Sequence, residues 1–179
     1  MERYIALLRG VNVGGKNKIS MPMLRAAMER NGFSNVSTYI NSGNIIFSHE
    51  KGDTAALQEK CRDIILREFG LDIDVAIISA GELAEAINHA PDWWDRDADS
   101  KHNTIFVIAP AKTPDIIADV GEAKPEYEKV GASGSVIFWS APISTFSRTR
   151  WSKIASTEAY KRITIRNANT AKKLLELVE

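Results

Sequence analysis

The sequence of 179 residues contains one cysteine, Cys61, which excludes an intrachain disulfide and is typical of a chain kept in a reducing compartment. It also lacks any run approaching the ~20 apolar residues that a membrane-spanning helix requires. The N-terminal segment MERYIALLRG has no apolar core of the kind that a signal peptide carries. We therefore expect a cytoplasmic protein with no membrane partner.

An excess of charge of either sign is also missing, because 23 basic side chains balance 23 acidic ones. This balance argues against a general nucleic-acid binder. The charges are nevertheless unevenly distributed. Residues 1–50 hold six basic and three acidic side chains, and residues 144–179 hold eight and three, while the segment between them is acidic. The two basic ends would form a local anion site if they meet in space. The alternative is scattered, solvated charge.

Signals for a metal, a cofactor or a nucleophile are absent as well. His49, His89 and His102 have no histidine or cysteine partner at metal-ligand spacing, so we predict no metal site. No Walker loop, GxGxxG fingerprint or GxSxG elbow occurs, so we predict no cofactor and can name no catalytic residue. Cys61 lies on the apolar stripe of an expected helix, which indicates a buried thiol.

The first half of the chain has the pattern of a β-α-β-β-α-β unit. Apolar periodicity, helix caps at Ser20 and Asp53, and the turn sequence Asn41-Ser42-Gly43-Asn44 define its elements. The expected order is a strand at 3–9, a helix after Ser20, strands at 36–40 and 45–47, a helix ending at Gly70, and a strand at 73–78.

The same order of elements recurs in the second half. Ser79 and Glu82 form a capping box for a linking helix. The elements expected after it are strands at 104–109, 127–130, 136–140 and 162–165, a helix at 113–121, a basic helical stretch at 146–155, and a last helix carrying Leu174 and Val178. The sequence thus predicts an α+β fold of two ferredoxin-like halves in tandem, residues 1–78 and 79–179, with linking and C-terminal helices.

A glycine-rich loop follows the first expected strand, with the sequence RGVNVGGKNK from Arg9 to Lys18. Glycines permit backbone with positive φ, so that successive N–H groups can point into one concavity. The start of the next helix and two lysines, Lys16 and Lys18, add positive charge. The loop is a candidate cradle for a phosphate or a carboxylate. The alternative is a βα connection whose glycines serve only the turn geometry.

Three separated motifs, RGVNVGGKNKI, TYINSGNIIF and TIRNANTAKKL, resemble the domain-of-unknown-function family 1697 over nearly the whole chain. The resemblance implies a small bacterial protein of two ferredoxin-like halves and implies no reaction. Its motif positions fall at Arg9, Gly10, Asn12, Gly14, Gly15, Lys16, Asn17, Tyr39, Ser42, Gly43, Asn44, Arg166, Asn167, Asn169 and Thr170. The sequence departs from the family pattern at Ala168, where tryptophan is expected, and at Asn41, where glutamine is usual.

We hypothesise that the protein binds a phosphate-bearing small molecule or nucleotide, since amide and glycine groups suit hydrogen-bonded recognition better than proton transfer. The candidate ligand-binding residues are Arg9, Asn12, Gly14, Gly15, Lys16, Asn17, Lys18, Ser42, Asn44, Arg166 and Asn167. For Ser42 and Asn44 the alternative is a hairpin held by its own side chains, and for Arg166 and Asn167 it is a surface arginine beside a helix cap.

Two other functions stay open. The interleaved Arg148, Arg150, Trp151 and Lys153 suggest contact with single-stranded nucleic acid. In the other, a structural or protein-interaction role, the motifs would serve the folding of the protein alone.

Trp93 and Trp94, in the acidic loop 92–99, either fix that loop to the rest of the protein or stack on a ligand.

Overall fold

The computed structural model describes residues 1–179, which form two compact units. Unit 1 comprises Met1–Leu83 and Leu174–Glu179, and unit 2 comprises Ala84–Lys173. Two helices, α3 (Ala80–Asn88) and α5 (Ala168–Val178), cross the boundary between the units. None of the helices combines the length and the apolar character needed to cross a membrane.

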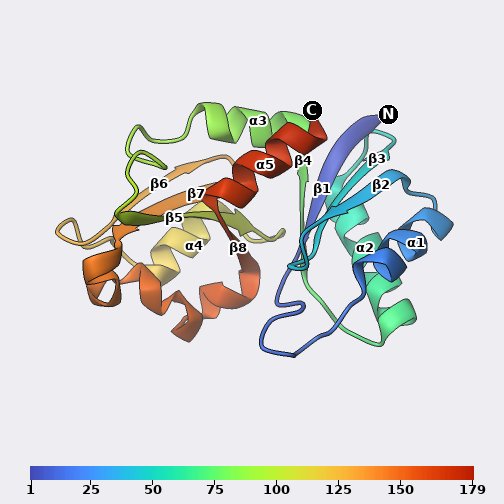
Figure 1. Cartoon of the computed structure of the whole chain (residues 1–179), viewed down its shortest axis with the longest axis horizontal. Helices are drawn as coiled ribbons and strands as arrows, with labels where there is room; N and C mark the ends of the chain where they lie inside the picture. The colour runs from blue at the N-terminus through green and yellow to red at the C-terminus, as the bar shows by residue number, and fades with distance from the viewer. The chain divides into compact units, whose positions relative to one another are not determined.

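Unit 1 is a four-stranded antiparallel sheet covered on one face by two helices (Figure 1). The strands lie in the order β2-β3-β1-β4, so that β1 pairs with both β3 and β4. The elements are β1 (Glu2–Leu8), α1 (Met21–Arg30), β2 (Ser34–Tyr39), β3 (Asn44–His49), α2 (Thr54–Phe69) and β4 (Val75–Ser79).

Local sequence signals set the ends of these helices. Ser20 caps α1 by accepting the Met23 N–H, and Asp53 caps α2 by accepting the Ala55 N–H at 2.9 Å. Gly70 ends α2 in the left-handed conformation, at φ 67°. The capping box at the start of α3 is also present, since Ser79 and Glu82 exchange bonds of 2.9 and 3.2 Å. These predicted helix boundaries are confirmed.

The core of unit 1 forms between this sheet and its two helices. Alternate residues of β1, namely Tyr4, Ala6 and Leu8, join the buried faces of α1 and α2. The Phe47 ring of β3 is stacked with Tyr4 at 5.7 Å and meets the edge of Phe33 at 4.8 Å. Cys61 is fully buried in this core, as its place on the apolar stripe predicted.

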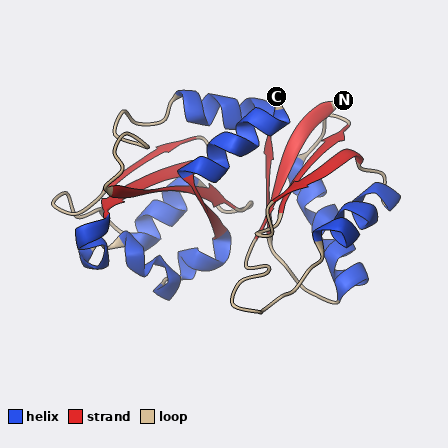
Figure 2. Cartoon of the chain, viewed as in Figure 1, coloured by secondary structure: helices blue, strands red, loops and turns tan.

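Unit 2 also contains a sheet with helices packed alongside (Figure 2). Its strand order is β6-β7-β5-β8, again antiparallel throughout. Its elements are β5 (Ser100–Val107), α4 (Thr113–Val120), β6 (Lys129–Ser133), β7 (Val136–Pro142) and β8 (Ile163–Asn167). Both sheets have the strand order of a ferredoxin-like unit. The α+β fold of two ferredoxin-like halves is therefore confirmed.

The expected strands shift by a few residues, as where the strand predicted at 127–130 is Lys129–Ser133. One element differs in kind: two short 3₁₀ helices, Ile143–Arg148 and Trp151–Ser156, occupy the helical stretch predicted at 146–155, and a third, Glu158–Arg162, follows it. Threonine hydroxyls break the ladder, because Thr149 donates to the Phe146 carbonyl and Thr157 donates to the Ile154 carbonyl, each at 2.7 Å. Such side-chain bonds compete with a continuous α-helix.

We predict that Gly43→Ala destabilises the protein more than Gly70→Ala. Both glycines have positive φ, which costs an alanine about 1–2 kcal/mol, but a Cβ at Gly70 meets open space. A Cβ at Gly43 would lie 2.7 Å from both Leu8 Cβ and Val11 Cγ2, which adds about 1–3 kcal/mol of overpacking. Urea unfolding of the two variants measures the difference, and equal losses would contradict the prediction.

We also predict a pH dependence that belongs to Cys61. Burial raises the pKa of this thiol to about 12, so the folded state keeps a proton that the unfolded chain releases above the ordinary value of 9.0. Stability is therefore lost as the pH rises from about 9 toward 12. Between pH 8 and pH 10 the wild type should lose about 1.4 kcal/mol more than Cys61→Ala, measured by urea unfolding. Parallel losses in the two proteins would count against a buried thiol.

Candidate functional site

The glycine-rich loop between β1 and α1 folds as a small hairpin. The Lys16 N–H donates to the Val13 carbonyl at 3.0 Å, and the Asn12 N–H donates to the Asn17 carbonyl at 3.2 Å. Gly14 and Gly15 form the tip with φ of 57° and 73°, which glycine adopts without strain. Both positive φ values are those of a tight type I′ turn.

Asn12 ties this hairpin to the rest of unit 1. Its amide group donates to the carbonyls of Ile19 at 3.0 Å and Asn41 at 2.7 Å, and its side-chain oxygen accepts the Ile19 N–H at 2.9 Å. Asn17 donates in the same way to the Gly10 carbonyl at 3.0 Å. Both residues also have positive φ, which asparagine tolerates. For Asn12 and Asn17 these bonds favour a role in loop structure over direct recognition of a ligand.

An open hollow of about 530 Å³ lies where the loop meets the start of α1. Its walls come from the loop, from the first turn of α1 and from the turn between β2 and β3. The lining residues are Asn12, Gly15, Lys18, Ile19, Ser20, Met21, Pro22 and Asn41. Three of the predicted loop residues, Asn12, Gly15 and Lys18, thus border the same space as the helix N-terminus, whereas Arg9, Gly14, Lys16 and Asn17 do not line it.

The hollow has positive electrostatic character. Lys18 belongs to its wall, and the first turn of α1 holds no acidic side chain to neutralise the helix dipole. Pro22 has no N–H, so the helix presents fewer donors than a usual N-terminus does. Lys16 is exposed on the hairpin and does not line the hollow. Of the two predicted lysines, Lys18 is therefore the one placed at this space.

The second motif forms the turn between β2 and β3. Asn44 is fully buried and donates to the Tyr39 carbonyl and to the Ser42 hydroxyl, each at 3.0 Å. These bonds give the hairpin internal support. Ile40, half exposed in the same turn, has a φ of 50°. That conformation is strained for a β-branched side chain.

Arg166 and Asn167 lie in unit 2, whereas the other nine candidate residues lie in unit 1. Asn167 accepts the Thr170 N–H at 2.8 Å and so caps α5. Arg166 is buried, not a surface residue, and donates to the Thr164 hydroxyl at 2.8 Å and the Ile165 carbonyl at 3.0 Å. Burial lowers the pKa of Arg166 to about 10, which leaves its guanidinium charged at neutral pH.

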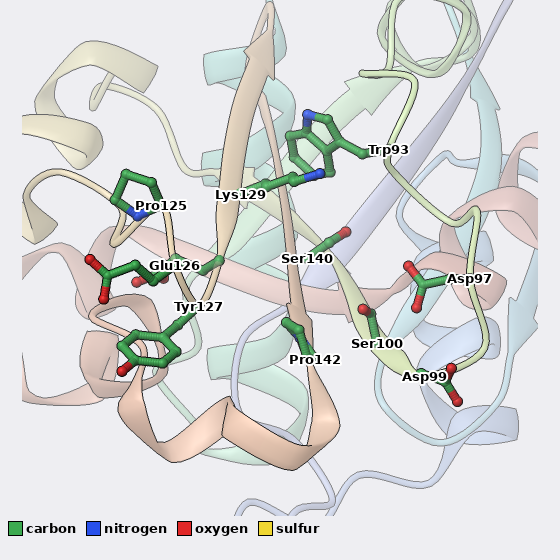
Figure 3. Close-up of a pocket in the computed structure, with 11 residues that line it drawn as sticks. Trp93, Asp97, Asp99, Ser100, Pro125, Glu126, Tyr127, Lys129, Ser140 and Pro142 are labelled. Atoms are coloured by element: carbon green, nitrogen blue, oxygen red, sulfur yellow. The ribbon is translucent and has the colours of Figure 1, made fainter.

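Unit 2 contains a pocket of about 340 Å³ that the sequence did not reveal (Figure 3). Strands β5, β6 and β7 form its floor, and the segments 93–99 and 125–127 form its sides. The lining residues are Trp93, Asp97, Asp99, Ser100, Pro125, Glu126, Tyr127, Glu128, Lys129, Ser140 and Pro142. No motif links these positions, since the strand pairing of unit 2 alone brings them together.

The tryptophans of unit 2 have separate roles. Trp94 is buried against Phe138 and donates to the Asn103 carbonyl at 3.1 Å, so it pins the acidic loop to the sheet. Trp93 lines the pocket. Trp151 is fully buried and donates to the Gly121 carbonyl at 3.1 Å, so it cannot stack on a base as the pattern around Arg148 suggested.

Comparisons with known proteins identify a family and a structural relative. A family model described as "Protein of unknown function (DUF1697)" matches residues 1–138. The structure of the conserved bacterial protein SP0830 from Streptococcus pneumoniae is similar, with a TM-score of 0.89 and 30% sequence identity over 99% of each chain. No curated protein matches the sequence.

We predict that Asn12→Asp destabilises the protein by about 2 kcal/mol, because a carboxylate would lose two donated bonds and face two carbonyl oxygens. The matched variant Asn17→Asp loses one donated bond and should cost about 1 kcal/mol. Both substitutions keep a residue type that tolerates positive φ. Urea unfolding compares the two, and a smaller loss for Asn12→Asp would show that Asn12 does not hold the loop.

Proposed function

Because the chain belongs to the DUF1697 family, whose function is unknown, we propose a function from the geometry of unit 1: it binds a phosphate-bearing small molecule in the hollow beside Lys18. The observation that carries this proposal is the meeting of three features at one space. These are the backbone of the glycine turn, the N-terminus of α1 and the Lys18 side chain.

The backbone supplies donors that the protein does not use. The N–H groups of Gly14, Gly15 and Met21 take no part in the hydrogen bonds of the hairpin or of the α1 cap. Gly15 and Met21 both line the hollow. Backbone N–H groups together with a helix dipole favour an anion, and a lysine ammonium adds a full charge.

The size of the hollow fits a small molecule. A volume of about 530 Å³ lies within the roughly 300–1,000 Å³ range of ligand sites. Ile19, Met21 and Pro22 give part of the wall an apolar surface, and Ile40 and Val13 are exposed next to lining residues. The ligand would therefore combine a phosphate with a less polar group, as a nucleotide does.

The rigidity of the loop supports the same proposal. Asn12 holds the hairpin, the approach to α1 and the β2–β3 turn in one arrangement before any ligand binds. A preformed site lowers the entropic cost of binding. The asparagines would thus act through the shape of the site, and Lys18 and the backbone would contact the phosphate.

Single-stranded nucleic acid is the second candidate ligand. The basic segment that contains Arg148 and Arg150 keeps its exposed cations, but its tryptophan is buried. Affinity for nucleic acid would fall steeply with salt, whereas a single phosphate contact gives a shallow dependence. In the third alternative, a structural or protein-interaction role, neither ligand would bind.

We predict that Lys18→Ala weakens phosphate binding about 10- to 150-fold, because it removes a charge-assisted bond of about 1.5–3 kcal/mol. Lys16→Ala, two residues away and outside the hollow, should change the affinity less than twofold. A thermal-shift screen with nucleotides, sugar phosphates and short single-stranded RNA at 50 and 200 mM salt would select the probe. Isothermal titration calorimetry would then measure the dissociation constants.

Three results would overturn the proposal. An equal effect of the two lysine substitutions would show that only general positive charge matters. Binding of RNA alone, with a steep salt dependence, would favour the nucleic-acid candidate. No thermal shift with any compound, in a protein whose unfolding transition is normal, would favour the role without a ligand.

A further inference from the structure

We propose that the pocket of unit 2 is an acyl-transfer site in which Ser140 is the nucleophile and His102 the general base, acting on a small uncharged carboxylic ester. This inference is independent of the phosphate site in unit 1. It starts from the direct hydrogen bond between the Ser140 hydroxyl and His102 Nδ1, which measures 2.6 Å. Nucleophile and base within such reach are the signature of covalent catalysis.

Strand register places three reactive side chains in a row. Ser140 of β7 is paired with His102 of β5 on one side and with Lys129 of β6 on the other. Residues directly opposite each other in an antiparallel sheet have their side chains on the same face, about 5 Å apart at Cβ. A base, a hydroxyl and an ammonium therefore lie side by side, and Ser140 and Lys129 line the pocket (Figure 3).

The hydrogen bonds around His102 define its tautomer. The Asp95 N–H donates to Nδ1 at 3.0 Å, so Nδ1 carries the lone pair and the ring proton is assigned to Nε2. Nε2 then donates to the Asp97 carbonyl at 2.7 Å. With this tautomer the one lone pair of Nδ1 is shared by two donors, the Asp95 N–H and the Ser140 hydroxyl, and the hydroxyl donates in the direction that activates a serine.

Asp97 acts as a positioning residue for the base. Its carbonyl fixes the orientation of the imidazole ring, and its carboxylate lies 3.8 Å from Nε2. A negative charge at that distance stabilises the imidazolium that forms when the base takes a proton. Figure 3 shows the Asp97 carboxylate turned toward the strands that carry Ser100 and Ser140.

The pocket also has walls for an apolar group and a cation for the developing charge. Trp93, Pro125, Tyr127 and Pro142 supply the apolar surface. Lys129 is the one cation among the lining residues and lies opposite Ser140 in the sheet, so it is the group that would stabilise an oxyanion formed there. The carboxylates of Asp97, Asp99 and Glu126 disfavour an anionic substrate, which is why an uncharged ester is the substrate class proposed.

Gly131 maintains the Trp93 wall. A Cβ at this position of β6 would lie 2.7 Å from Pro91 Cγ and 3.5 Å from Trp93 Cζ2. Its φ is not in the left-handed region, so the close approach of the Pro91–Trp93 segment accounts for the glycine.

The reaction balances with water as the only co-reactant. Ser140 Oγ forms a bond to the ester carbonyl carbon while its proton moves to His102 Nδ1. The bond between that carbon and the alcohol oxygen breaks, and the alcohol leaves with the proton from Nδ1. Water then attacks the acyl-serine with the same base, which releases the carboxylic acid and restores the hydroxyl. The Asp95 N–H competes with the Ser140 hydroxyl for the Nδ1 lone pair, so turnover should be slow.

The test uses a fluorophosphonate probe, whose phosphorus is attacked by an activated serine with loss of fluoride, and p-nitrophenyl acetate as the ester. Mass spectrometry of a tryptic digest should place a single adduct in the peptide 130–148, which contains Ser140. Ser140→Ala should lower the labelling rate and the ester hydrolysis by more than about 100-fold. Ser147→Ala, which removes an exposed hydroxyl of the same tryptic peptide outside the pocket, should retain both activities within about twofold.

Circular dichroism melting of each variant separates chemistry from folding, because Ser140→Ala loses one hydrogen bond and should stay folded. Ser140→Cys adds a second readout, since a nucleophilic site should transfer acetyl to the introduced thiol. Absence of labelling in the folded wild type would overturn the proposal. So would an adduct outside 130–148, or hydrolysis retained by a folded Ser140→Ala variant.

Discussion

Each unit depends on the hydrogen bonding of its first strand on both sides, at one of the two central positions of its sheet. In unit 1 this first strand is β1, and in unit 2 it is β5. The chain leaves β1 at Leu8, whose N–H donates to the Gly43 carbonyl at 2.8 Å, so the glycine-rich loop starts against the β2–β3 turn. Asn12 then bonds to Asn41 across that contact and the hollow forms beside it. In unit 2 the register of β5 against β7 places His102 opposite Ser140. Both candidate sites therefore follow from strand pairing.

Much of the fold could be predicted because its signals are local. A cap such as Ser20 or Asp53 lies within a few residues of the helix that it starts, and the period of apolar residues is visible in a short window. The 3₁₀ segments were missed because threonine hydroxyls at 149 and 157 compete with the backbone, a choice that depends on how the chain packs.

Each candidate site likewise has features that the sequence predicts and features that appear only in the folded structure. The glycine turn could be recognised from its composition, but the bond from Asn12 to Asn41 spans 29 residues and appears only after folding. Ser140 and His102 are 38 residues apart, and no spacing rule connects them. His102 looks isolated in the sequence because no histidine or cysteine lies at metal-ligand spacing from it. A register prediction for β5 against β7 would have been needed to find its partner.

The division into two units also separates the chain's natural reporter groups. All four tryptophans, at 93, 94, 139 and 151, lie in unit 2, and the one thiol lies in the core of unit 1. Intrinsic fluorescence consequently observes the packing of unit 2, while the rate at which Cys61 becomes accessible to a thiol reagent observes the opening of unit 1. The unlabelled protein can therefore reveal whether its two sheets unfold in one cooperative transition or in two.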